Sequence, residues 1–110
     1  MIYEVRRYET MPGMMPALHE LMANVAMPVF EKVGMRVVGA WEPLVGDYSN
    51  VLTYVLAWES MNERAEKWDV FFSHSDWKMG RREAVKKLGK PMVSREFHFF
   101  LSPTSYSPLQ

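Results

Sequence analysis

Polar side chains alternate along the start of the chain, where the sequence IYEVRRYE (Ile2 to Glu9) predicts a β-strand. Because neighbouring side chains of a strand point to opposite faces, Glu4, Arg6 and Tyr8 share one face. A guanidinium group binds a carboxylate or a developing oxyanion, and a carboxylate or a phenol can carry a proton. The row is therefore either a solvated surface or the polar part of a cavity, and this strand alone leaves both open.

A second strand, Val51 to Trp58, is apolar on both faces. A strand of that kind needs cover on both sides, so we expect it in the middle of a sheet. Tyr54 and Trp58 point to the same face of it. A helix follows at once, because Ser60 can cap its first turn and Glu63 can accept a hydrogen bond from the Ser60 N–H, which makes a capping box.

Three helical segments are expected. In the first, apolar residues recur at helical spacing from about Met14 to Lys32. Pro28 cannot donate a main-chain hydrogen bond, so it predicts a kink or break near Asn24. The other two segments run from about Met61 to Phe72 and, after a break at Ser73 to Asp76, from about Asp76 to Leu88.

Two further strands complete the pattern. The strand from Met35 to Leu44 contains Pro43, which fits only an edge strand or a bulge. The residues expected on one of its faces are Val37, Gly39 and Trp41. Residues 46–50 predict a hairpin turn into the strand from Val51, and the last strand runs from Met92 to Leu101.

The order of these elements is strand, helix, strand, strand, helix pair, strand, which is the ferredoxin-like split βαβ pattern. It predicts an α+β fold with a four-stranded antiparallel sheet whose first and third strands lie in the middle. Right-handed crossovers put all helices on one face and leave the other bare. Large apolar residues on that bare face predict a homodimer, or a higher homo-oligomer, in which two sheets close into an α/β barrel.

The composition indicates one small domain without charge bias. The chain has 110 residues, 13 Lys and Arg against 13 Asp and Glu, and no cysteine. Balanced charge argues against nucleic-acid binding, and the lack of cysteine excludes disulfides and thiolate metal sites. The N-terminus lacks a signal-peptide pattern and no apolar run reaches ~20 residues, so we expect a cytoplasmic protein without a membrane span. Residues 1–110 are predicted to form a single domain, with 103–110 as an extended C-terminal arm.

The chain resembles the NIPSNAP family, within the dimeric α/β-barrel superfamily. Each matching motif is short, but together and in this order they are fairly specific, and they cover nearly the whole chain. The motifs are YEVRRYETMPG (Tyr3 to Gly13), VVGAW (Val37 to Trp41), AWESMNERAEKW (Ala57 to Trp68), Asp76-Trp77 and LSPTSYSPLQ (Leu101 to Gln110).

The resemblance implies a ferredoxin-like half-barrel that dimerises, but no settled activity. Eukaryotic members look like mitochondrial proteins that are involved in mitophagy and trafficking. Bacterial members are largely uncharacterised. The wider superfamily includes cofactor-free monooxygenases, small-molecule isomerases and haem enzymes. This chain differs from the eukaryotic members in lacking a presequence, which favours a short bacterial member.

The resemblance also places the polar row of the first strand inside the protein, beside Tyr54 and Trp58. The expected catalytic residues are Arg6, Glu4 and Tyr54, with Arg6 binding an acidic oxygen and Glu4 or a tyrosine handling a proton. The expected ligand-binding residues are Tyr8, Trp41, Trp58 and His98. The alternative is that Glu4 and Arg6 form a purely structural pair that braces the dimer.

No metal or tightly bound cofactor is expected. The three histidines, His19, His74 and His98, lack the spacing of a metal site, and haem binding has only the fold in its favour. Basic residues gather at Arg81, Arg82, Lys86 and Lys87, but the mixed charges of the whole chain argue against nucleic acid.

Two functional hypotheses follow. The first is a homodimeric protein that binds or converts a small hydrophobic or aromatic molecule in an aromatic-lined pocket, on a scaffold like that of a monooxygenase or isomerase. The second is a non-enzymatic protein-interaction module that presents the barrel and the C-terminal arm as a docking surface.

Overall fold

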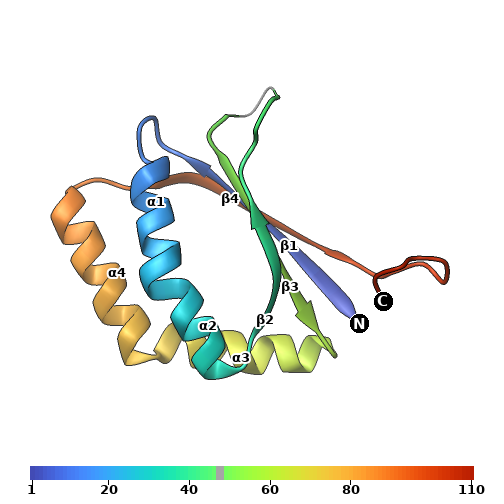
Figure 1. Ribbon diagram of the computed structural model, residues 1–110. Helices are drawn as coiled ribbons and strands as arrows, with labels where there is room; N and C mark the ends of the chain where they lie inside the picture. The colour runs from blue at the N-terminus through green and yellow to red at the C-terminus, as the bar shows by residue number, and fades with distance from the viewer. Residues whose placement is uncertain (47–48) are drawn as a thin grey trace.

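One antiparallel sheet carries all the helices on a single face (Figure 1). The structure is a computed structural model that describes residues 1–46 and 49–110. Its strands are β1 (Ile2–Thr10), β2 (Arg36–Trp41), β3 (Val51–Trp58) and β4 (Val93–Leu101). The sheet order is β2-β3-β1-β4, which confirms that the first and third strands are central. The hairpin turn predicted over 46–50 includes residues 47–48, which lie outside the described residues.

The first helix is broken where proline predicts it. It consists of α1 (Met15–Leu21), a π-helical turn η1 (Met22–Ala26) and α2 (Met27–Val33). The Met27 N–H donates to the Met22 carbonyl, five residues back, and Pro28 has no N–H to donate. The predicted break near Asn24 is therefore confirmed as a π turn.

Two more helices follow β3 as expected, α3 (Met61–Ser73) and α4 (Ser75–Leu88). Ser60 caps α3 by accepting from the Glu63 N–H at 3.1 Å. The Glu63 carboxylate accepts from the N–H of Glu59, one residue before the partner that the capping box predicts. His74 caps α4, because its Nδ1 accepts from the Asp76 N–H at 3.1 Å.

The helix-facing side of the sheet holds the core. Leu52, Tyr54, Leu56 and Trp58 of β3 pack there against Phe30, Trp68 and Phe71 of the helices. The register pairs Glu4, Arg6 and Tyr8 with Leu56, Tyr54 and Leu52, so the polar row of β1 lies on this same side. The polar row of the first strand is therefore covered by the helices rather than solvated.

The predicted face of β2 is wrong. The pairing with β3 shifts register between Val37 and Gly39, so Val37 lies opposite Leu56 on the helix side. Trp41 lies opposite Thr53, on the other side of the sheet. A bulge of one residue accounts for this, because it moves every later side chain of the strand to the opposite face.

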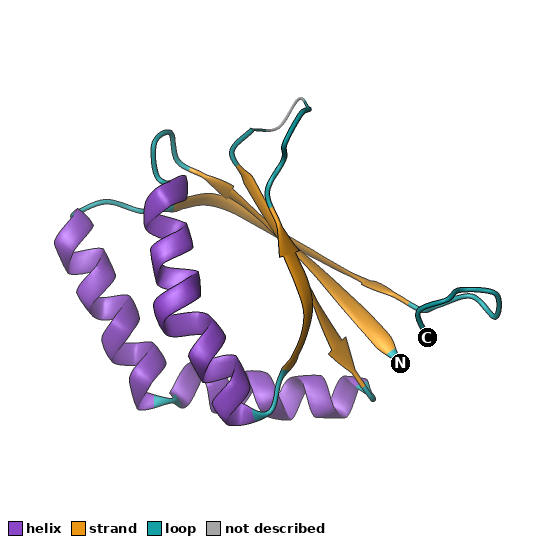
Figure 2. Ribbon diagram, viewed as in Figure 1, coloured by secondary structure: helices purple, strands orange, loops and turns teal. Residues whose placement is uncertain are grey.

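The other side of the sheet is left open, as Figure 2 shows. Trp41 is 54% exposed there and Phe99 45%. The segment after β4 differs from an extended arm: it turns back on itself, with the Ser107 N–H bonded to the Thr104 carbonyl. The Tyr3 hydroxyl donates to the main-chain oxygen of Gln110 at 2.6 Å and ties the end of this loop to β1.

Helix α4 stands away from the sheet. None of its residues, all of which the structure describes, is buried. It packs on α3, α1 and η1, and a Cβ on Gly80 would lie 2.5 Å from Val25 Cγ1. Glycine is needed at this position because the two helices approach so closely. No helix within the described residues is both long and apolar enough to cross a membrane.

Candidate functional site

A buried carboxylate on β1 organises the space between the sheet and the helices. Glu4 is fully buried and accepts five hydrogen bonds. The donors are Arg6 Nη1 at 2.8 Å, Trp58 Nε1 at 2.9 Å, Arg64 Nε and Nη2 at 3.0 and 3.1 Å, and Trp68 Nε1 at 3.2 Å. They come from β1, β3 and α3, so this one side chain joins the two central strands to the helical layer.

The five donors keep Glu4 ionised. Burial alone would raise the pKa of Glu4, but hydrogen bonds from Arg64, Arg6 and Trp68 and the charge of Arg6 lower it from 4.5 to about 2. A carboxylate with such a low pKa and five donors around it is a poor proton carrier at neutral pH. Its geometry fits a positioning role, in which it holds the guanidinium of Arg6.

Arg6 joins this carboxylate to two phenols. Its Nη1 bonds Glu4, and its Nε donates to the Tyr54 hydroxyl at 2.9 Å. Its Nη2 lies 3.3 Å from the Tyr8 hydroxyl. The guanidinium also lies over the Trp68 ring, 4.6 Å from its centre. Burial would lower the pKa of Arg6, but Tyr54, Tyr8 and Glu4 outweigh it and the pKa lies above its ordinary value, so the side chain is a permanent cation.

The hydroxyls of Tyr8 and Tyr54 form a hydrogen bond whose direction is set by Arg6. Their hydroxyls lie 2.7 Å apart, and Tyr54 is buried to 1% exposure. Burial raises the pKa of Tyr54 well above its ordinary value, so it stays protonated. Because Arg6 can only donate to Tyr54, the Tyr54 proton is satisfied when it points to Tyr8. The Tyr8 proton then has no further acceptor within residues 1–46 and 49–110, which leaves one O–H free for a ligand.

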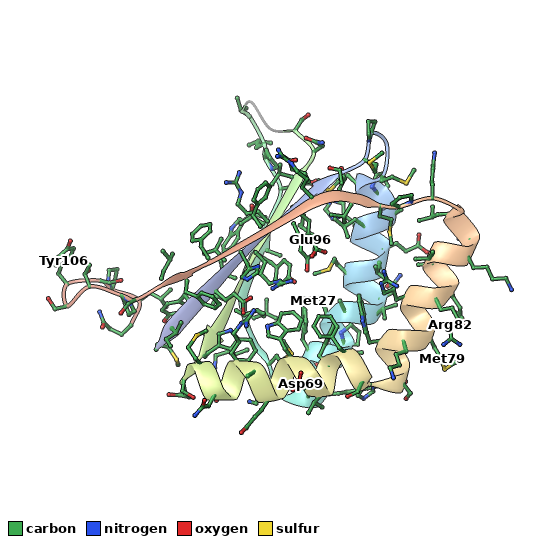
Figure 3. All side chains as sticks on the ribbon, turned by 180° about the vertical axis from the view of Figure 1, so that it is seen from behind. Met27, Asp69, Met79, Arg82, Glu96 and Tyr106 are labelled. Carbon is green, nitrogen blue, oxygen red and sulfur yellow. The ribbon has the colours of Figure 1, made fainter. Side chains whose placement is uncertain are left out.

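A cavity of about 890 Å³ opens beside this pair, between the sheet and α3 and α4. Its floor holds Arg6 and Tyr8. Its aromatic walls are Tyr8, Phe30, Tyr54, Trp68, Phe71, Phe72 and Trp77. Its charged mouth is formed by Lys78, Arg81, Arg82 and Lys86 of α4 and by Glu96 of β4. Figure 3 labels Glu96 projecting from β4 toward the helices and Arg82 on α4. An apolar space of this size with a few convergent polar groups is typical of a small-molecule site.

The structure brings together five of the seven residues predicted for the site, namely Arg6, Glu4, Tyr54, Tyr8 and Trp58. Trp58 is fully buried behind Glu4 and does not line the cavity. Trp41 lies on the opposite face of the sheet because of the bulge in β2. His98 pairs with Arg6 in the register, but it is exposed and stands outside the lining of the cavity.

None of the three histidines lines this cavity. Histidine is one of the side chains that bind a haem iron, and cysteine, methionine and tyrosine are others. His19 is paired with Glu42 on the surface, His74 caps α4, and His98 lies outside the lining. Among the side chains that the structure describes, no three His, Asp or Glu gather as metal ligands.

Two residues that contact Glu4 were not singled out from the sequence. Arg64 makes a two-point contact with Glu4, and Trp68 both bonds Glu4 and supports Arg6. Both lie on α3, four residues apart, so they share one helix face. That spacing was the available signal, since a buried carboxylate on β1 needs cationic and N–H partners from a neighbouring element.

The fold places this protein among ferredoxin-like α+β domains. A putative antibiotic biosynthesis monooxygenase from Nitrosomonas europaea has the same fold, with a TM-score of 0.64 at 10% identity over 94% of this chain and 98% of that one. The NIPSNAP family profile matches residues 3–108, so the chain belongs to the NIPSNAP family. This confirms the resemblance seen in its motifs.

Two solved structures of NIPSNAP proteins have this fold. A NIPSNAP family protein of unknown function from Agrobacterium tumefaciens is 21% identical, covers 100% of this chain and 94% of its own, and has a TM-score of 0.84. An uncharacterized NIPSNAP domain protein from Burkholderia xenovorans is 18% identical over 98% and 99%, with a TM-score of 0.81. No curated protein matches the chain.

Proposed function

We propose that the cavity between the sheet and helices α3 and α4 binds a small aromatic or apolar molecule that carries an acidic oxygen. The observation that supports this most directly is the pairing of a permanent cation, Arg6, with the free hydroxyl of Tyr8 at the floor of an aromatic-walled space. A carboxylate, phenolate or enolate oxygen would accept from both groups. The aromatic walls would supply apolar contact to the rest of the molecule.

The site has the means to stabilise negative charge that forms during a reaction. Arg6 is fixed by Glu4, Tyr54 and Trp68, so its donors are already oriented before a ligand enters. Preorganised donors of this kind stabilise an oxyanion, as monooxygenase and isomerase chemistry on an aromatic or enolisable substrate requires. In this proposal Arg6 and Tyr8 contact the substrate, Tyr54 and Glu4 position them, and no tightly bound cofactor takes part.

Binding of matched probes tests the proposal. We expect 2-naphthoate to bind more tightly than its neutral amide, 2-naphthamide, by about tenfold in isothermal titration calorimetry. Tyr8→Phe should remove much of that preference, whereas Tyr106→Phe, at an exposed tyrosine in the C-terminal loop, should leave it unchanged. Equal binding of the two probes would contradict the proposal. Failure of both to bind would favour the alternative of a non-enzymatic interaction module.

We also propose that a second copy of this chain covers the open face of the sheet. Large apolar side chains remain exposed on that face at both edges of the sheet, with Trp41 on β2 and Phe97, Phe99 and Leu101 on β4. Monomers seldom leave a large apolar surface exposed. Pairing two such faces would bury it and leave the cavities, which lie on the helix side, open to ligand. Light scattering coupled to size-exclusion chromatography should then give about twice 12.9 kDa.

A further inference from the structure

Helix α4 presents a row of cations to the cavity, and none of them has a partner within the described residues. Lys78, Arg81, Arg82 and Lys86 all line the mouth of the cavity. No hydrogen bond or ion pair holds any of these four side chains in residues 1–46 and 49–110. Across the mouth, Glu96 is the carboxylate among the described lining residues. The chain as a whole is neutral, so this local excess of positive charge is not a general property of its surface.

The spacing of these cations destabilises helix α4. Lys78, Arg82 and Lys86 are four residues apart, so they are neighbours on one helix face. Like charges at this spacing destabilise a helix. None of the residues of α4 is buried, and the helix packs on α3, α1 and η1 rather than on the sheet. An anionic group bound at the mouth would relieve the repulsion.

The two ends of the cavity therefore differ. Its floor offers one cation that is already paired with Glu4, together with a neutral hydroxyl, which suits a single acidic oxygen. Its mouth offers four cations without partners, which suits a group of higher charge. A cleft lined by charge of one sign also concentrates counter-ions and speeds their association.

From this arrangement we infer that the ligand carries, at the end away from Arg6, a multiply charged anionic group such as a phosphate or diphosphate ester. This rests on the proposed function of the cavity and specifies its substrate class: an acidic aromatic or apolar body with a phosphorylated tail. The body lies against the aromatic walls, and the tail lies among Lys78, Arg81, Arg82 and Lys86.

The test compares 6-hydroxy-2-naphthoate with its 6-phosphate ester by calorimetry. The ester should bind about tenfold more tightly at low salt, and the advantage should shrink as salt screens the exposed cations. The double variant Arg81→Gln/Lys86→Gln should lose this advantage. The matched control, Lys87→Gln/Lys90→Gln, removes the same charge from positions outside the lining and should keep it.

Other outcomes would overturn the inference. Equal affinity of the two compounds, or equal losses in both double variants, would show that the mouth has no specific role. Competition by inorganic phosphate as effective as the ester would show an adventitious anion site. If these results appear while Tyr8→Phe still removes the preference for 2-naphthoate over 2-naphthamide, the inference fails and the proposed function stands. If that preference is absent as well, both fail.

Discussion

Arg64 of α3 donates two hydrogen bonds to Glu4 of β1, with Nε 3.0 Å from Oε1 and Nη2 3.1 Å from Oε2. This paired geometry is the strongest form of an arginine–carboxylate contact. It spans 60 residues of sequence and fixes the helical layer to the central strand. The same carboxylate also binds Arg6. The position of this cation at the floor of the cavity therefore depends on α3, a helix that does not adjoin β1 in the sequence.

Glu4→Gln should destabilise the protein strongly. The substitution keeps the shape of the side chain but leaves two guanidinium groups and two indole N–H groups around a neutral amide. Breaking a buried ion pair in this way costs about 3–5 kcal/mol. Urea denaturation of the variant measures the loss. Glu9→Gln, which removes an exposed pair with Arg95, is the control and should change stability little.

The same carboxylate predicts a specific acid sensitivity. The pKa of Glu4 lies at about 2 in the folded protein, below its ordinary value of 4.5. The pKa of Glu4 is lower in the folded state than in the unfolded state, so its ionised form stabilises the protein at pH values above the unfolded-state pKa. This stabilisation is lost as the pH falls through the folded-state pKa. Between about pH 4.5 and 2, the stability difference between the wild type and Glu4→Gln should therefore narrow by about 3 kcal/mol. A constant difference over that range would contradict the assignment.

Tyr54→Phe should cost about 1–3 kcal/mol, because it removes the acceptor of a buried Arg6 N–H. The variant should also weaken 2-naphthoate binding, since Tyr8 loses the neighbour that directs its proton. Thermal unfolding and calorimetry measure the two effects. A stability change no larger than that of Tyr106→Phe would show that the buried hydroxyl pair contributes nothing.

Gly80→Ala should destabilise the contact between α4 and η1. The added Cβ would lie 2.5 Å from Val25 Cγ1, and overpacking costs about 1–3 kcal/mol, against a gain of about 1 kcal/mol in helix propensity. The double variant Gly80→Ala/Val25→Ala should recover most of the loss, because it removes the clashing methyl groups. If the second substitution only adds to the first, then the close approach of the helices is not what requires glycine.

Phe99→Glu should convert the proposed dimer to a monomer. Phe99 lies opposite Val5 on the open face of the sheet and is 45% exposed in the single chain. A charge at this position would be solvated in the monomer but buried without a partner in a sheet-to-sheet interface. Light scattering measures the mass. Glu96→Gln, on the cavity side of the same strand, should leave the dimer intact. A wild-type protein that is already monomeric would refute the proposal.

Local sequence patterns were enough to predict the strands and helices and their order. Alternating and helical spacing located the strands and helices, Pro28 located the break that became η1, and Ser60 located the start of α3. These signals are local, since each depends on side chains within one or two turns or on one strand. Together they match the ferredoxin-like split βαβ pattern, which was sufficient for the sheet order and for a central β1.

The surroundings of the polar row of β1 depend on contacts between elements that are distant in the sequence. Alternation tells which residues share a face but not which face meets the helices, and the bulge in β2 moved Trp41 to the opposite side. The donors of Glu4 come from elements up to 64 residues away, and no local pattern encodes such a contact. The free hydroxyl of Tyr8 and the cations at the mouth of the cavity became visible only once the sheet, α3 and α4 were placed around one space.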